Sequence, residues 1–95
     1  MKLHQKGFLL ATLSKSEGMW DYQLTTKVFE EYTESGDFRE KTIRIALDEL
    51  SSAGLINRIE SKLETINGKA KLSFKYQISD FGISRMLDTR LLLQQ

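Results

Sequence analysis

Apolar side chains recur with the period of an α-helix at the start of the chain. One stripe holds Leu3, Leu10 and Leu13, and Leu9 widens it. This spacing predicts a first helix from about residue 3 to residue 16. Gly18 follows it, and glycine is the commonest residue just after a helix, so we expect the helix to end there.

The next apolar positions predict an extended link and a second helix. We interpret the stretch MWDYQL, residues 19–24, as the link. Thr25 is a residue type that caps helix N-termini, so the second helix is predicted from about Thr25 to about Tyr32. The stretch TESGD after it is typical of a turn.

A third helix is predicted over about residues 37–53. Asp37 can cap its first turn, and Glu40, three residues on, can reach back as in a capping box. Gly54 stands where a left-handed cap is needed to end the helix. The apolar face of this helix consists of Ile43, Ala46, Leu47 and Leu50.

The pattern then changes to the alternation of strands, over about residues 55–78. Asn67-Gly68 divides this stretch and is a strong signal for a two-residue hairpin turn. The turn sets a register with the pairs Leu63–Leu72, Ile59–Tyr76 and Asn57–Ile78, and with Glu64–Lys71 and Glu60–Lys75 on the outer face. Leu72, Phe74, Tyr76 and Ile78 then share the buried face.

Ser79 can cap a last helix over about residues 80–94. The predicted order is therefore helix, short strand, helix, helix, hairpin, helix. This order predicts one α+β domain over residues 1–95, a winged helix-turn-helix with three helices, a two-stranded wing and a C-terminal helix. In that fold the third helix is the recognition helix, which enters the major groove of DNA, and the hairpin is the wing.

Two family resemblances fall on these segments. LHQKGFLLA, TTKVFEEY and LDELSSAGLIN, within residues 3–60, resemble the C-terminal winged-helix domain of archaeal origin-recognition initiators, the Orc/Cdc-type ATPases. YQISDFGISRML, residues 76–87, is similar to the strand-to-helix junction of PadR- and MarR-like regulators. Lys41 and Thr42 stand where the initiators usually carry paired arginines, and the sequence has no phosphate-binding loop of an ATPase. The resemblance therefore implies either an excised initiator-type domain or a stand-alone regulator.

Composition narrows the function classes. The 95 residues include no cysteine and one histidine, so neither a disulfide framework nor a cysteine-based zinc site is expected. No apolar run approaches the roughly 18 residues of a membrane span. The scattered carboxylates and single histidine form no pattern typical of catalysis. We therefore predict a cytoplasmic, chromosome-associated binding protein without cofactor or metal, and not an enzyme.

The front of the third helix carries the predicted DNA contacts. With its apolar face inward, the helix exposes Lys41, Thr42, Arg44 and Ile45, and Arg39 at its end can still reach a phosphate. These residue types supply phosphate ligands, a hydrogen-bonding hydroxyl and an apolar contact for a thymine methyl group. The competing explanation is ordinary surface charge, with Arg44 and Asp48 as an i,i+4 ion pair.

The wing supplies two further candidates, Lys69 and Lys71, for contacts to phosphates or the minor groove. Lys71 has a second explanation, because the register places it opposite Glu64. Lys69 has no acid opposite it and is the stronger candidate.

The last helix predicts a partner. Leu87, Leu91, Leu92 and Leu93 cover most of its circumference, and one domain can bury only one side of a terminal helix. The leftover apolar surface favours a twofold homodimer; the alternatives are a helix packed within its own domain or a frayed end.

These features together predict a protein that binds double-stranded DNA, either a small transcription regulator or a replication-initiator-type domain. The alternative is a winged helix that binds another protein without DNA, because the same fold serves both uses. The acidic stretch from Glu30 to Asp37, just before the recognition helix, supports that alternative.

Overall fold

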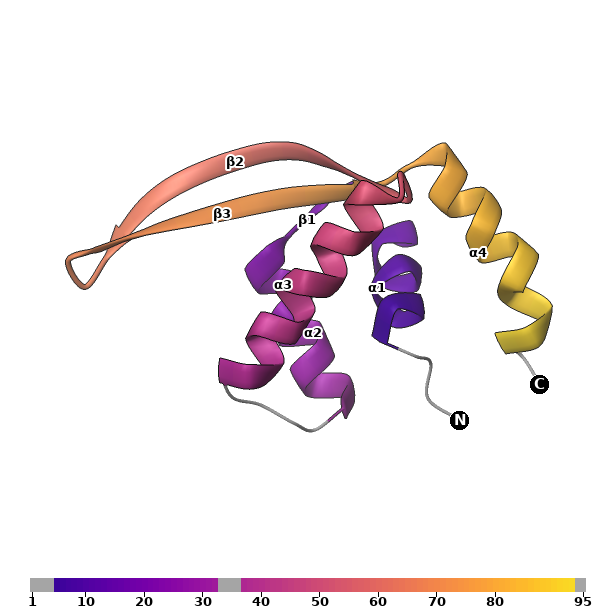
Figure 1. Ribbon diagram of the computed structural model, residues 1–95, viewed down its shortest axis with the longest axis horizontal. Helices are drawn as coiled ribbons and strands as arrows, with labels where there is room; N and C mark the ends of the chain where they lie inside the picture. Colours follow the sequence, from indigo (N-terminus) through magenta and orange to yellow (C-terminus); the bar gives the residue numbers. More distant parts are fainter. Residues whose placement is uncertain (1–4, 33–36, 94–95) are drawn as a thin grey trace.

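The computed structural model describes residues 5–32 and 37–93, with side chains over residues 5–31 and 40–88. The elements follow the predicted order (Figure 1). They are α1 (Gln5–Ser14), β1 (Met19–Trp20), α2 (Asp21–Tyr32), α3 (Asp37–Ser52), β2 (Ile56–Ile66), β3 (Lys69–Ile78) and α4 (Asp80–Leu93). The strands form one antiparallel sheet in the order β1-β3-β2. This is the winged helix predicted from the sequence.

The core lies between α1, α2, α3 and the base of the sheet. The buried face of α3 is the predicted one, Ile43, Ala46, Leu47 and Leu50. From the other elements it is joined by Leu9, Leu13, Leu24, Val28, Ile56 and Tyr76. In α1 the fully buried positions are Leu9 and Leu13, one turn apart, whereas Leu10 is half-buried; the predicted Leu3 lies outside the described residues.

The start of α2 differs from the prediction. Only Met19 and Trp20 are extended, and the helix begins at Asp21 rather than Thr25. Gln23 explains the earlier start, because its Oε1 accepts the backbone N–H of Trp20 at 2.9 Å and so caps the helix. The Thr25 hydroxyl donates to the carbonyl of Asp21 at 2.9 Å, so Thr25 already lies within the helix.

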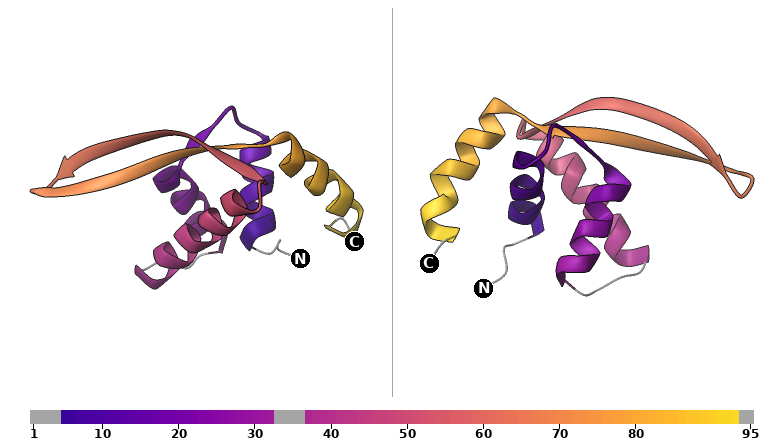
Figure 2. Two further views of the ribbon diagram at one scale, coloured as in Figure 1. Left: turned by 45° about the horizontal axis from the view of Figure 1, so that its top comes forward. Right: turned by 180° about the vertical axis from the view of Figure 1, so that it is seen from behind.

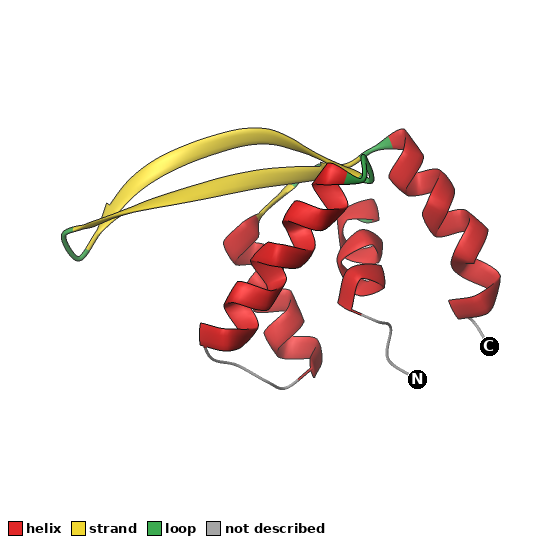
Figure 3. Cartoon of the chain, in the orientation of Figure 1, coloured by secondary structure: helices red, strands yellow, loops and turns green. Residues whose placement is uncertain are grey.

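The wing, β2 and β3 with their turn, projects from the helical body at one end of the 47 Å long axis, and α4 lies at the other end (Figure 3). Asn67 and Gly68 have φ of 53° and 77°, as the predicted turn requires. On the predicted buried face, Phe74 and Ile78 are half-buried and Tyr76 is buried. Leu72 is exposed by 47% and Leu63, opposite it, by 70%, because the outer half of the wing extends beyond the helices.

The predicted register holds from the turn to the base of the wing and then fails. Leu63–Leu72, Glu64–Lys71 and Glu60–Lys75 are partners as predicted. A β-bulge between Arg58 and Glu60 adds one residue to β2, so the predicted pairs Ile59–Tyr76 and Asn57–Ile78 are wrong. Tyr76 lies opposite Arg58, and Ile78 lies opposite Ile56.

The junction between the wing and α4 is held by the end of α3. Ser79 caps α4 as predicted, because its Oγ accepts the N–H of Gly82 at 2.9 Å. The same hydroxyl donates to the carbonyl of Gly54 at 2.6 Å, and the Ser79 N–H donates to the carbonyl of Leu55 at 3.0 Å. Gly54 has φ of 79°, the left-handed conformation expected of it.

Asp21 joins the start of α2 to the wing. Asp21 is 5% exposed, and its Oδ2 accepts the backbone N–H of Phe74 at 3.1 Å. Because β1 ends at Trp20, opposite Lys75, the carboxylate takes the place of the next residue of β1 along the edge of β3. This hydrogen bond connects the start of α2 to β3 and so helps to fix the base of the wing.

We expect Asp21→Ala to lower the free energy of unfolding by about 2 kcal/mol, because the Phe74 N–H loses its partner. Urea denaturation followed by circular dichroism measures this. Asp21→Asn is the matched control. Its amide oxygen can still accept the N–H of Phe74, whereas its amide nitrogen cannot accept the N–H of Tyr22, which Oδ1 of Asp21 accepts at 2.7 Å. Equal losses for both variants would show that the hydrogen bond to Phe74 does not provide the stabilisation.

Candidate nucleic-acid interface

The outward face of α3 carries the residues expected there. Lys41, Arg44 and Ile45 are exposed as predicted, Ile45 by 58%, whereas Thr42, also predicted to be exposed, is half-buried. The side chain of Arg39 lies outside the described residues. The front half of α3 and the wing lie on the same side of the molecule, and α4 lies on the opposite side (Figures 1 and 2). A ligand long enough to span both elements could therefore contact the first turns of α3 and the wing together.

The acids of α3 with described side chains are each paired with a cation. Arg44 pairs with Glu40 at 3.6 Å, so the i,i+4 pair predicted between Arg44 and Asp48 is wrong. Asp48 instead meets Arg58 of β2 at 3.3 Å, and Glu49 meets Lys6 of α1. Such exposed pairs add little stability. They do offset the negative charge that these acids would otherwise present to a phosphate backbone.

Arg58 is a residue that the sequence analysis missed. Its guanidinium lies over the ring of Phe74, 3.7 Å from the centroid, and Nη2 donates to the hydroxyl of Tyr76 at 3.2 Å and to Asp48 at 3.3 Å. In the predicted register Arg58 would have faced outward. The bulge turns it toward α3, and the sequence carries no clear signal for that bulge.

The charges of the wing are partly paired. Lys75 and Glu60 form the predicted cross-strand pair, at 3.3 Å. Glu64, predicted to pair with Lys71, meets Lys62 of its own strand at 3.1 Å, although Lys71 is its cross-strand neighbour. Lys69 is exposed at the tip and lies opposite Ile66, so it has no acid opposite it, as predicted.

Trp20 and Tyr22 hold the outer face of the wing. Their rings are stacked with centroids 6.2 Å apart and planes 13° apart. The ammonium of Lys62 lies 4.3 Å from the Trp20 centroid and donates to the Tyr22 hydroxyl at 2.9 Å. The hydrogen bond with Tyr22, then that with Glu64, raises the pKa of Lys62 above its ordinary value.

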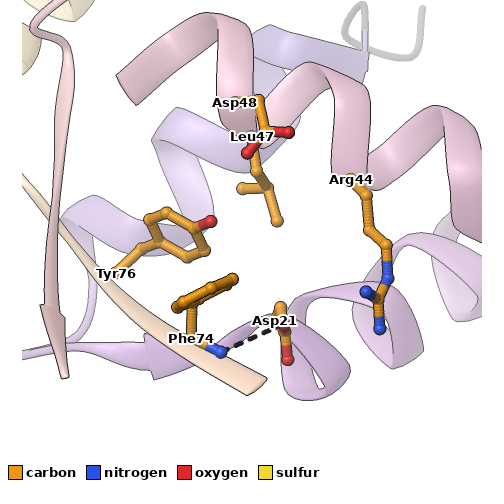
Figure 4. Close-up of a pocket in the computed structure, with 6 residues that line it drawn as sticks. All are labelled: Asp21, Arg44, Leu47, Asp48, Phe74 and Tyr76. Carbon is orange, nitrogen blue, oxygen red and sulfur yellow. Dashed lines mark hydrogen bonds between the residues drawn. The ribbon is translucent and has the colours of Figure 1, made fainter. Parts of the chain in front are cut away.

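A small pocket lies in the corner between α2, α3 and β3 (Figure 4). It is lined by Asp21, Arg44, Leu47, Asp48, Phe74 and Tyr76, and its volume is about 90 Å³. This is room for a few water molecules and is well below the usual size of a small-molecule site. The side chains of Phe74 and Tyr76 extend from β3 toward α3, so the pocket is part of the contact between α3 and the wing.

α4 carries exposed apolar side chains. Ile83 and Leu87, one turn apart, are 39% and 50% exposed, and Leu91 continues their row along the helix. The side chains of Leu91, Leu92 and Leu93 lie outside the described residues. The helix contacts α1 (Figure 2). Within the described ranges, no helix has the length and apolar character needed to cross a bilayer.

Two solved structures of other proteins have a similar fold. The candidate transcriptional regulator TA0346 of Thermoplasma acidophilum is 23% identical, with a TM-score of 0.67 over 95% of this chain and 80% of that one. The structure of the hsRosR-S1 complex is 17% identical, with a TM-score of 0.70 over 98% of this chain and 72% of that one. No protein-family model matches the sequence, and no curated protein matches it significantly.

At these identities the likeness establishes the winged-helix fold. The resemblances to origin-recognition initiators and to PadR- or MarR-like regulators remain predictions.

Proposed function

We propose that this protein binds double-stranded DNA and acts as a small transcription regulator on chromosomal DNA in the cytoplasm. The observation that carries the proposal is the placement of the exposed front of α3 and of the wing on one side of the molecule. The fold of a candidate transcriptional regulator supports the same function over the replication role.

In this proposal α3 enters the major groove. Lys41 and Arg44 bind phosphates, Thr42 hydrogen-bonds at a base edge or phosphate, and Ile45 contacts a thymine methyl group. The exposure of Lys41, Arg44 and Ile45 supports these roles, as do the ion pairs that offset the acids of α3. Arg39, at the start of the helix, adds a phosphate contact.

The wing contacts the DNA next to that groove. Lys69 at the tip binds a phosphate or the edge of the minor groove, and Lys71 assists it. Lys71 is half-buried and neighbours Glu64 across the wing, so we assign it the smaller share.

The protein acts as a homodimer through α4. We assign the dimer contact to the apolar residues Ile83, Leu87 and Leu91 of α4. This helix lies on the side of the molecule opposite the wing, so a second copy joined there would leave both recognition helices and both wings accessible. Two copies on a twofold axis would place the recognition helices in successive major grooves, about 34 Å apart, on a pseudo-palindromic site. Leu92 and Leu93 extend the contact.

Salt dependence tests the DNA-binding function. With four phosphate ligands, Arg39, Lys41, Arg44 and Lys69, duplex affinity is expected to fall roughly 150-fold per protomer between 50 and 200 mM salt. Fluorescence anisotropy of a labelled duplex measures this, on sites recovered by selection from random sequence. Lys69→Ala should weaken all sequences alike and reduce the slope by about one, whereas Thr42→Ala should also change which sequence is preferred.

Lys27→Ala is the matched control, because Lys27 is an exposed lysine on α2, outside the proposed interface. If selection recovers no duplex, or if affinity does not respond to salt, the DNA-binding function is wrong. The protein would then belong to the winged helices that bind other proteins.

A further inference from the structure

Two cations of β2 attach the wing to the body, one on each face. Arg58 lies against Phe74 and Tyr76 on the face toward α3. Lys62 lies against Trp20 and Tyr22 on the outer face. Each combines a cation–π contact with a hydrogen bond to a tyrosine hydroxyl, at 3.2 Å for Arg58 and 2.9 Å for Lys62.

The bulge at Ile59 creates this two-sided arrangement. Along a regular strand, residues 58, 60 and 62 would share one face. Because β2 contains one extra residue between Arg58 and Glu60, Arg58 shares the face of Tyr76, whereas Glu60 and Lys62 remain on the outer face. The bulge therefore aims one arginine at the recognition helix.

Arg58 is the cation that joins the wing to α3. One guanidinium contacts the ring of Phe74 with its face, and its Nη2 reaches Tyr76 of the wing and Asp48 of α3. A planar guanidinium with fixed donors constrains direction more tightly than an ammonium does. The two hydrogen bonds of Nη2 are both made within the protein, one to the wing and one to α3, which favours a structural link between these elements.

The base of the wing decides where its tip lies. Leu63 and Leu72 in its outer half are 70% and 47% exposed, so packing there contributes little to its direction. A small rotation at the base moves Lys69, eight or more positions away along the wing, by a large distance. Whatever fixes the angle at Arg58 thus fixes the separation between the tip and α3.

We propose that Arg58 is a positioning residue that sets the angle of the wing relative to α3. It thereby places Lys69 where it can contact the duplex while α3 lies in the major groove. The consequence for DNA rests on the proposed function. The angle itself does not, and it can be measured in the free protein.

The first test measures the angle as a distance. The chain has no cysteine, so spin labels on Ala70→Cys in the wing and Ser52→Cys at the end of α3 report one distance by pulsed electron resonance. Arg58→Met should broaden and shift that distribution, and Arg58→Lys should restore it in part. Arg85→Met, an arginine on α4, is the control and should leave it unchanged. A distribution that Arg58→Met does not alter would overturn the proposal, provided that circular dichroism shows the variant folded.

The second test measures coupling in duplex binding. Lys69→Ala should cost roughly tenfold at 0.1 M salt in the otherwise unmodified protein, because one phosphate contact carries a salt slope of about 0.9. In the Arg58→Met background the same change should cost less than about twofold, since the tip is already displaced. Independent sites would instead give losses that multiply to within about twofold, which would show that Arg58 acts alone. If the unmodified protein binds no duplex, the proposed function fails and the distance measurement alone decides the role of Arg58.

Discussion

Replacing Gly82 by alanine is expected to lower the free energy of unfolding by about 3 kcal/mol, at the upper end of what overpacking usually costs. A Cβ at Gly82 would lie 2.0 Å from the carbonyl oxygen of Leu55 and 2.8 Å from Cγ1 of Ile78. The same carbonyl oxygen also accepts the N–H of Ser79, so it cannot move without breaking the junction that starts α4. We therefore expect α4 to shift away from the end of α3.

Urea denaturation gives the loss of stability, and amide chemical shifts of residues 79–88 report the displacement of α4. The matched control is Gly54→Ala, the same substitution in the same junction. Gly54 has open space around its Cβ position but a φ of 79°, so only backbone strain of about 1 kcal/mol is expected there. A larger loss for Gly54→Ala than for Gly82→Ala would mean that strain, not the close approach to Leu55, limits this junction.

The features predicted well from the sequence are those that local physics determines. The four apolar residues on one face of α3, from Ile43 to Leu50, are buried, so the helix has the predicted orientation. Asn67 and Gly68 adopt the positive φ angles of a tight hairpin, which fixes the register nearby. Ser79 caps α4 through the N–H of Gly82. Each of these signals acts over a few residues, so the sequence alone contains it.

The features that were missed depend on contacts between distant segments. Asp21 lies 53 residues before Phe74, whose N–H it accepts, and this contact accompanies the early start of α2. The bulge at Ile59 places Arg58 between Tyr76 and Asp48, and no local sequence pattern indicates this placement. The missed pairing of Asp48 follows from the same bulge, because the arginine that binds it comes from the wing rather than from its own helix.

The candidate site divides in the same way. The exposure of Lys41, Arg44 and Ile45 follows from helical periodicity and is confirmed. Their DNA contacts stay predictions, as do those of Lys69 and Lys71. What the structure adds is the relation between the two contact elements. Arg58 joins α3 to the wing, and it is not among the predicted DNA contacts of either element.

Replacing Leu87 and Leu91 together by glutamate is expected to produce a folded monomer that binds a two-half-site duplex roughly 100-fold more weakly. A second recognition helix tethered to the first raises the effective concentration at its half-site, and such avidity is typically worth 10² or more. Two carboxylates in the apolar row of α4 would oppose association, because burying an unpaired charge costs far more than the row gains. Light scattering gives the mass, and anisotropy gives the affinity.

Phe81→Glu is the matched control for this experiment. Phe81 is also an exposed apolar residue of α4, 54% exposed, but at 100° per residue it lies about 160° around the helix from Ile83. The Phe81→Glu variant should have nearly the same mass in solution and nearly the same duplex affinity as the unmodified protein. Binding to a duplex with one half-site should be equal for the monomeric variant and the unmodified protein, since each recognition helix is intact. The homodimer is refuted if the unmodified chain scatters as a monomer at concentrations well above those used for binding, and Leu87 and Leu91 would then be surface positions of a domain that binds DNA as a single copy.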